Sequence, residues 1–370
     1  MEDRPASSSA VLALLRELTA LPGPSGHERE VALAYAKRLH AFTDEVRLDP
    51  FGNVIAVLRG TDARGSVMVS AHLDEVGLVV KHVEDDGMLR IDLNGLIDER
   101  VLLAAQVDIW TRGGPRPGVV GARSRHHLTP DELRRPIETS DLWITVGADS
   151  AADAQALGVR IGDLVTFRPN FEELAGGYVA SKSLDNRAGL TAVLDALTRL
   201  PARRDFDLYV VGAAQEEVGS RGARVAAQTL SPHVAISVDT VAGAEPGTAL
   251  ARATEALGGG PVIRAWEWVA GSLTGAAYHR GLFHRLQDTA DAARLPYQLD
   301  VARTWTDACG TTTAGHGVPT AGIYIPRRCA HSPCEIAKLS DVEGAGRLLA
   351  AFLSSVTGTE LRDLGSPTPV

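Results

Sequence analysis

Apolar residues recur along much of the chain with two periods, one typical of helices and one of buried strands. Val11, Leu14, Leu15 and Leu18 lie three or four residues apart and predict a helix near the N-terminus. The runs NVIAVLRG and SVMVSA that come later are almost entirely apolar, as expected of strands covered on both faces. Helical spacing returns over residues 184–198, and the strand-like runs DLYVVGA, HVAISVD and AGIYIP then alternate with further helical patterns. This alternation predicts an α/β/α domain built on a mixed sheet.

The pattern between these two parts is different, because it consists of short alternating runs. GLVVKHVEDDGMLRIDLNG reads as two strands around an Asp-Asp-Gly turn, and QVDIWTRGGPRPGVVGA as two more around a Gly/Pro turn. LWITVGADS and GDLVTFRPN add further short strands. We therefore predict a small β-barrel-like domain at residues 77–176, inserted into one α/β domain formed by residues 1–76 and 177–357. Residues 358–370 are polar and contain Pro and Gly, which predicts a loose tail.

Local signals also predict where a second helix begins. Ser25 and Glu28 have the spacing of a capping box, in which the two side chains satisfy free backbone amides at a helix start. Apolar residues at helical spacing follow them. The sequence thus predicts that Ser25 caps this helix.

Composition and charge narrow the class of protein. Hydrophobic residues make up 45% and charged residues 22% of the 370 positions, which is ordinary for a globular protein. The net charge of −9 and the lack of a Lys/Arg block argue against a nucleic-acid partner. No apolar run approaches the roughly 18 residues of a membrane span, and the N-terminus does not resemble a signal peptide. Three cysteines are too few for a disulfide framework, so we expect a cytoplasmic protein.

Polar residues stand at the ends of the predicted buried strands. Ligands of open α/β sheets bind outside the carboxyl ends of the strands, so these side chains are candidates to meet in one crevice. They are two histidines and several carboxylates: His72, Asp74, Asp185, Glu216, Glu217, Asp239 and His331.

This set of residue types points to divalent metal. Imidazole and carboxylate are zinc-type ligands, and five candidate ligands are more than one catalytic zinc normally takes from a protein. Two metal ions that share a carboxylate, about 3.5 to 4 Å apart, would use all five. The adjacent carboxylates of Glu216 and Glu217 fit the same hypothesis, since a nearby dication favours their ionisation. One of them can bind metal while the other takes a proton from a water molecule.

Six segments, in this order, resemble the glutamyl-aminopeptidase or tetrahedral-aminopeptidase family of metallopeptidases: AHLDEVG, KSLDNRAG, QEEVGSRGA, SVDT, TDA and PRRCAHSPCE. The resemblance spans nearly the whole chain. It implies a peptidase domain interrupted by a barrel-like module and an enzyme that removes N-terminal residues from short peptides. It also implies two divalent metal ions per subunit, zinc or cobalt, and homo-oligomers, from dimers to hollow dodecamers, that form through the module.

The resemblance assigns a role to each candidate residue. It implies that His72 and Asp239 bind one metal ion, that Glu217 and His331 bind the other, and that Asp185 bridges the two.

Two further residues have expected roles in catalysis. Glu216 matches the family's general base, which activates the water between the metals. Asp74 matches the carboxylate that supports His72, and a carboxylate that orients a ligand imidazole also makes physical sense. The chain departs from the family at Cys329, where a tyrosine is usual.

Alternatives remain for individual residues. Asp185 could simply start a helix, and Glu216 and Glu217 could cap the helix that follows them. Asp74 could be a direct ligand. Cys329 and Cys334 could be soft metal ligands, although small buried hydrophobes are commoner. Arginines near the site could favour acidic substrates or be structural, namely Arg303, Arg327 and Arg328.

Two other functions are compatible with the same residues. One is a related two-metal amidohydrolase that acts on N-acyl amino acids or small metabolites. The other is a non-catalytic assembly protein that keeps the fold.

Overall fold

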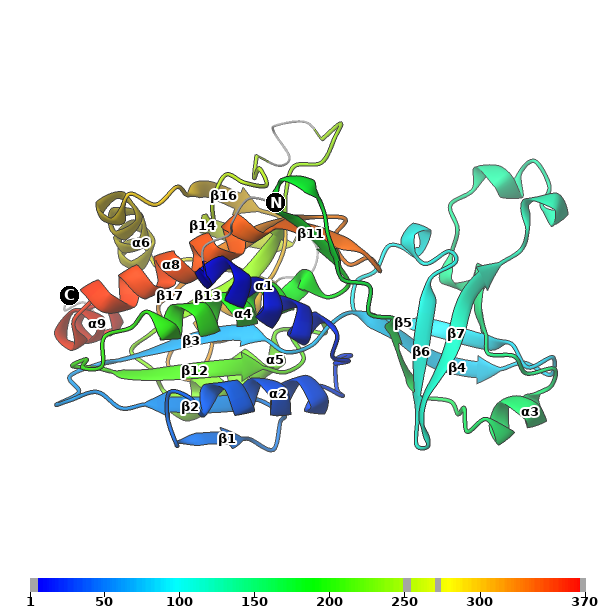
Figure 1. The fold of residues 1–370 in the computed structure, drawn as a ribbon, viewed down its shortest axis with the longest axis horizontal. Helices are drawn as coiled ribbons and strands as arrows, with labels where there is room; N and C mark the ends of the chain where they lie inside the picture. The colour runs from blue at the N-terminus through cyan, green and yellow to red at the C-terminus, as the bar shows by residue number, and fades with distance from the viewer. Residues whose placement is uncertain (1–5, 249–253, 270–273, 367–370) are drawn as a thin grey trace.

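A large mixed sheet forms the centre of the α/β part of the molecule (Figure 1). The computed structural model describes residues 6–248, 254–269 and 274–366. The strands of this sheet are β1 (Val46–Leu48), β2 (Val54–Leu58), β3 (Ser66–His72), β10 (Glu172–Glu173), β11 (Tyr178–Ser181), β12 (Asp207–Ala213), β13 (Val234–Ala242), β14 (Val262–Val269), β15 (Thr274–Ala277), β16 (Gln298–Ala302), β17 (Thr320–Arg328) and β18 (Glu335–Lys338). Their order is β1-β2-β12-β3-β13-β17-β18-β11-β10, and β14 joins β15 and β16 to β17.

Helices cover both faces of this sheet. One side carries α2 (Arg29–Leu39), α4 (Leu184–Thr198) and α8 (Leu339–Ser355), with α1 (Ala6–Thr19) against α4 and α6 (Arg280–Ala293) against α8. The other side carries α5 (Arg221–Leu230) and α7 (Asp307–Thr312). Alternate residues of β2 show the two layers, because Val54 and Ala56 pack in the core of α2 and α4 whereas Ile55 and Val57 pack in the core of α5. The predicted α/β/α arrangement on a mixed sheet is confirmed.

The inserted module is a closed barrel with its own core. Its strands are β4 (Gly77–Val83), β5 (Leu89–Asn94), β6 (Gln106–Thr111), β7 (Gly114–Ala122), β8 (Leu142–Thr145) and β9 (Leu164–Phe167), in the closed order β4-β5-β8-β7-β6-β9. The short helix α3 (Ala151–Ala156) lies between β8 and β9. The two predicted hairpins are β4–β5 and β6–β7. Side chains such as Leu78, Val107 and Ile109 fill the barrel, which confirms the barrel-like fold expected of this segment.

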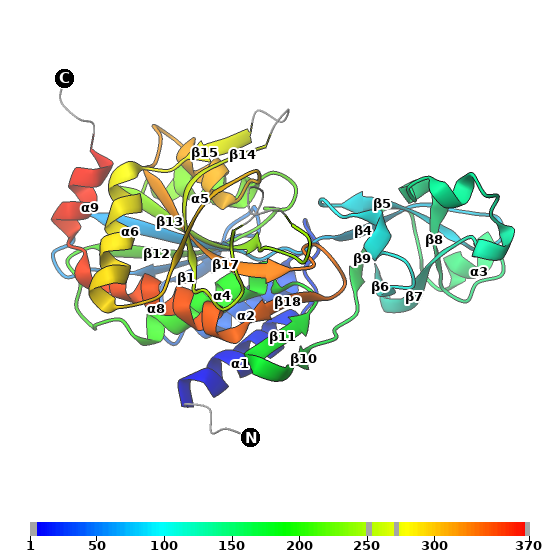
Figure 2. The same cartoon turned by 90° about the horizontal axis from the view of Figure 1, so that it is seen from above.

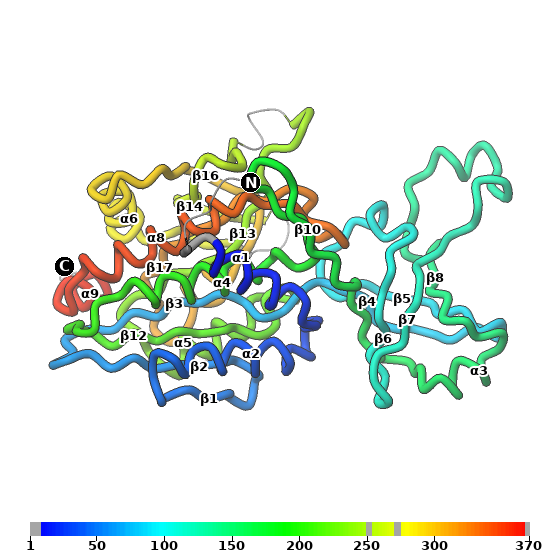
Figure 3. Tube along the Cα trace, in the orientation of Figure 1, coloured from blue at the N-terminus to red at the C-terminus, as the bar shows by residue number. Residues whose placement is uncertain are grey.

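The central part of the sheet is parallel, and its carboxyl edge faces the barrel. The strands β3, β12, β13 and β17 pair in parallel, so they all end at the same edge. The chain passes from the end of β3 directly into β4, and Figure 2 shows the barrel projecting beyond this edge. The tube in Figure 3 shows the chain returning to the sheet through β10. The inserted barrel is therefore next to the strand ends on which the candidate residues lie.

Two local predictions were wrong. Ser25 does not cap α2: its hydroxyl donates to Asp74 at 2.6 Å, and α2 begins after Glu28 without a side-chain cap. The tail expected over residues 358–370 begins with the helix α9 (Gly358–Gly365). Leu361 is fully buried there and the Gly358 amide donates to Asp205. In both cases a contact far away in the sequence decided the structure, and local composition does not record such contacts.

None of the described helices combines the length and apolar character needed to cross a bilayer.

Candidate metal centre

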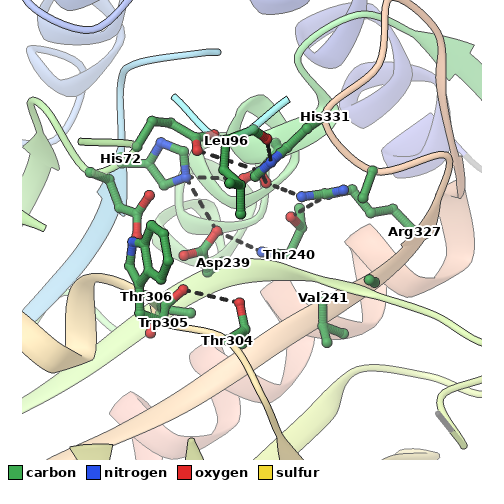
Figure 4. Close-up of a pocket in the computed structure, with 15 residues that line it drawn as sticks. His72, Leu96, Asp239, Thr240, Val241, Thr304, Trp305, Thr306, Arg327 and His331 are labelled. Carbon is green, nitrogen blue, oxygen red and sulfur yellow. Dashed lines mark hydrogen bonds and ion pairs between the residues drawn. The ribbon is translucent and has the colours of Figure 1, made fainter. Parts of the chain in front are cut away.

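Six of the seven side chains expected at the strand ends meet in one cavity at the carboxyl edge of the sheet (Figure 4), and the seventh, Asp74, lies against His72. The six come from five separate segments of the chain. They are His72 at the end of β3, Glu216 and Glu217 after β12, Asp239 in β13, Asp185 in the first turn of α4 and His331 after β17. Convergence from separate elements is what a site at the end of a parallel sheet requires.

Asp185 lies at the centre of this group, and its two carboxylate oxygens point to different members of it. Its Oδ1 is 3.0 Å from Nε2 of His72, which is itself 3.4 Å from Oδ1 of Asp239. Its Oδ2 is 3.3 Å from Nε2 of His331, which is 3.4 Å from Oε2 of Glu217. The two oxygens of one carboxylate thus face two separate pairs of ligand-type atoms. Both trios, Asp185 with each pair, lie close enough together to hold a metal ion.

A buried carboxylate holds the His72 side of the cavity in place. Nδ1 of His72 is 3.1 Å from the Asp74 carbonyl oxygen and 3.4 Å from Oδ1 of Asp74, which turns Nε2 toward Asp185. Asp74 also accepts hydrogen bonds from the backbone amides of Glu216 and Glu217, at 2.9 and 3.0 Å. Asp74 therefore orients the His72 imidazole and fixes the turn with the paired glutamates.

Hydrogen bonding also keeps Asp74 ionised. Burial alone would raise the pKa of Asp74, but hydrogen bonds from His72, Ser25 and the Glu216 amide outweigh it and hold the pKa below its usual range. The hydroxyl that was predicted to cap a helix thus contributes to the site instead.

A second buried carboxylate, Glu335, holds the His331 side of the cavity in place. Its Oε2 accepts the backbone amide of Asp185 and its Oε1 that of His331, both at 2.9 Å. The guanidinium of Arg327 lies 3.2 Å from Glu335, contacts Asp185 and donates to the Thr240 hydroxyl at 2.7 Å. Sequence reasoning gave Glu335 no role, since nothing in its local pattern shows that it lies beside Asp185.

The barrel supplies one contact to the site. Nδ1 of His331 is 2.5 Å from the carbonyl oxygen of Leu96, in the segment between β5 and β6. A ligand histidine normally donates its second ring N–H to a carbonyl or carboxylate, which fixes the tautomer and turns the other nitrogen toward the metal. The inserted module thus orients a side chain of the α/β domain. A backbone carbonyl has no signature in the sequence, so this contact could not be predicted.

The site contains more buried negative charge than its own cations neutralise. Burial raises the pKa of Glu217 to about 8 and that of Asp307, a neighbour at the start of α7, also to about 8. Oε1 of Glu217 and both carboxylate oxygens of Asp307 have no hydrogen-bond partner. Burial alone would lower the pKa of His331, but Glu217 and Asp185 outweigh it and raise the pKa to about 9. Unpaired buried carboxylates beside two imidazoles fit divalent cations.

The pKa of Glu216 is raised well above its ordinary value, by burial first and then by Glu217 and Asp239, with His72 opposing them. Glu216 also forms a third close group with His72 and Glu217, so proximity alone does not separate a ligand from a base. Its Oε1 is 3.3 Å from the Ser220 hydroxyl. Cys329 and Cys334 belong to none of the metal-type groups found among the described residues.

Comparisons with known proteins identify the family and the fold. The model of the M42 glutamyl aminopeptidase family matches residues 52–348. A lysyl aminopeptidase of Pyrococcus furiosus is 33% identical over 93% of this chain and 96% of its own length. An aminopeptidase of the archaeon Desulfurococcus kamchatkensis superposes with a TM-score of 0.91 at 34% identity, over 96% of this chain and 98% of that one. A Pyrococcus horikoshii peptidase, TET1, which can assemble into a tetrahedron or a large octahedral shell, superposes with a TM-score of 0.82 at 30% identity, over 94% and 100%.

Proposed function

The chain belongs to the M42 glutamyl aminopeptidase family and is an aminopeptidase, and from that premise we propose that it works with two divalent cations. The observation that carries the proposal is the position of Asp185, whose two oxygens face His72 with Asp239 on one side and His331 with Glu217 on the other. A carboxylate in that position can bridge two metal ions. The unpaired oxygen of Glu217 supports the same assignment.

Two bound cations would supply Lewis acidity for the scissile carbonyl and would lower the pKa of a water molecule toward neutrality. The protein contributes proton transfer and positioning. We assign Glu216 as the group that takes the proton from the attacking water and returns it to the leaving amine. Asp74 accepts a hydrogen bond from the backbone amide of Glu216 and so positions the turn that carries the Glu216 side chain. We assign Asp74 and Glu335 as positioning residues, since they hold ligand residues through backbone and imidazole contacts.

The test is Glu216→Gln in protein reconstituted with zinc or cobalt. We expect kcat for an aminoacyl-arylamide to fall by about 10²- to 10⁴-fold, because the amide cannot accept a proton. Metal content by mass spectrometry should stay at two ions per chain. Glu172→Gln on the exposed strand β10 is the matched control and should retain normal kcat. Near-normal hydrolysis by Glu216→Gln with both metals bound would exclude this mechanism.

Three further assignments belong to the same proposal. The metal is zinc or cobalt, since both accept imidazole and carboxylate ligands. The chain forms homo-oligomers through the barrel, supported by the assemblies that related peptidases form. The protein is cytoplasmic, which suits Cys309, Cys329 and Cys334, all unpaired.

A further inference from the structure

The cavity at the metal centre is also lined by uncharged residues, which together we call the uncharged wall. Among the described residues that line it, the charged and imidazole groups are those of the metal centre, Glu216 and Arg327. The rest of the described lining includes the apolar side chains of Leu96, Val241 and Trp305 and the hydroxyl of Thr304 (Figure 4). We take this wall as the part of the cavity that the N-terminal side chain of a substrate contacts, since the other described lining residues belong to the metal centre or pair with it.

Arg327 is the single guanidinium or ammonium group in that lining, and it is already engaged. It is 4% exposed, donates from Nε to the Thr240 hydroxyl and lies between the carboxylates of Asp185 and Glu335. Even if a metal ion took over Asp185, Glu335 and Thr240 would still hold the guanidinium. Turning it toward a substrate would leave Glu335 buried without its cation, which is costly. Nη1 of Arg327 makes no hydrogen bond, but it lies 3.2 Å from Glu335, so the guanidinium would have to leave this carboxylate to pair with an acidic N-terminal residue.

A basic N-terminal residue finds no carboxylate in the described lining outside the catalytic groups either, since Asp307 is 1% exposed and does not line the cavity. The carboxylates in the described lining are Asp185, Glu216, Glu217 and Asp239, and all of them are used by the metal centre or by proton transfer. A lysine or arginine side chain would lose its hydration against Val241 and Trp305 without gaining an ion pair.

We propose that this pocket selects peptides whose N-terminal residue has an uncharged, apolar side chain, such as leucine, methionine or phenylalanine. The inference rests on the proposed function, because it takes the metal centre as the place of the scissile bond. It separates this chain from its lysyl relative in Pyrococcus furiosus and from the glutamyl activity in the family's description. Burying an unpaired charge is what excludes acidic and basic residues.

The first experiment compares arylamides of leucine, methionine, phenylalanine, glutamate and lysine with the metal-reconstituted protein. We expect kcat/KM for the three apolar substrates to exceed that for the charged two by about tenfold or more. Cleavage of the lysyl or glutamyl substrate as fast as the leucyl one overturns the inference and leaves the aminopeptidase standing. Failure to cleave any of the five overturns the proposed function, and the inference with it.

The second experiment changes the charge of the wall at one position. Thr304 is half-buried, and its hydroxyl contacts the Trp305 carbonyl at 3.4 Å, so replacing it removes little. Thr304→Lys should raise the ratio of glutamyl to leucyl kcat/KM by about tenfold, and Thr304→Glu should do the same for the lysyl ratio. The two variants control for each other, since a general disturbance would move both ratios alike. Unchanged ratios in two folded, metal-loaded variants would show that this wall does not contact the substrate side chain.

Discussion

Two clusters of buried charge lie in the same α/β domain and differ in how they are neutralised. In the first, the guanidinium of Arg264 donates to Asp300 from Nε and Nη2 and to Glu267 from Nη1, at 2.7 to 3.1 Å. The ring of Tyr324 lies 4.3 Å from the guanidinium. Burial alone would lower the pKa of Arg264, but Asp300 and Glu267 outweigh it and raise the pKa well above its usual range. The second oxygen of Glu267 accepts from Thr306.

The candidate metal centre is the second cluster, and it contains buried carboxylate oxygens that no other side chain satisfies. Glu217 and Asp307 are buried with oxygens that have no partner, and burial raises both of their pKa values to about 8. One cluster is a closed ion-pair network, whereas the other has buried carboxylates that only protons or added cations can neutralise. The comparison teaches that an unsatisfied buried cluster identifies a binding site better than buried charge alone does.

An Asp→Asn substitution in each cluster should give the largest difference in activity between the two. Asp185→Asn should lower kcat/KM by about a thousandfold or more, because an amide cannot offer two anionic oxygens to two metal ions. Asp300→Asn should keep activity within about tenfold while lowering the melting temperature, because it weakens a buried ion pair away from the reacting groups. Arylamide kinetics, metal analysis and thermal unfolding measure both. Equal losses of activity in two folded proteins would mean that the clusters do not differ in function.

The pH dependence of stability tests the surplus negative charge directly. In metal-free protein the raised pKa values of Glu217, Asp307 and His331 mean that the folded state binds more protons than the unfolded state above about pH 5. The free energy of unfolding should therefore fall, by at least ~2 kcal/mol, between about pH 5.5 and 8.5. The lowered pKa values of Asp74 and Asp185 act only in more acidic solution. Denaturant melts in chelator measure this, and added zinc should abolish the loss at the higher pH.

Two matched variants assign that slope to one cluster. Glu217→Gln removes a titrating carboxylate and should flatten the decline. Glu267→Gln should change the slope less, since Glu267 is only the last of the groups that raise the pKa of Asp307, and it should lower stability at every pH by about 3 kcal/mol. A metal-free protein that becomes more stable toward pH 8.5 would contradict the assignment of unpaired carboxylates to the site.

A smaller effect is expected from the contact between the barrel and the metal centre. Gly95 has a φ of +98°, and a Cβ there would lie 2.8 Å from the Val76 side chain, so Gly95→Ala should displace the neighbouring Leu96 carbonyl. Loss of the hydrogen bond between this carbonyl and His331 should weaken the binding of one of the two proposed metal ions by about tenfold. The affinity for the other ion should stay unchanged. Competition titration against a chelator measures the two metal affinities separately. Gly147→Ala is the control, since its φ is +79° but an added Cβ meets no atom within 4 Å. Equal weakening of both ions would argue against this coupling.

The sequence by itself determined the repeating parts of the structure. Hydrophobic periodicity predicted the strands around the site, the helix that begins near Asp185 and the change to a barrel, because burial on one or two faces repeats at a fixed spacing. It also placed candidate ligands such as His72 and Asp239 at strand ends. Motif resemblance then added an expected role for each of them.

Only the tertiary structure decided how these side chains are held. His72 meets Asp185 across 113 positions and His331 meets the Leu96 carbonyl across 235, and no local pattern encodes such pairs. The same holds for Ser25, which left its predicted cap to bind Asp74, and for Arg327, which is neutralised by Glu335 and Asp185. Periodicity records how each segment is buried. Charge balance and hydrogen-bond satisfaction depend on which segments meet, and that is fixed only when the whole chain has folded.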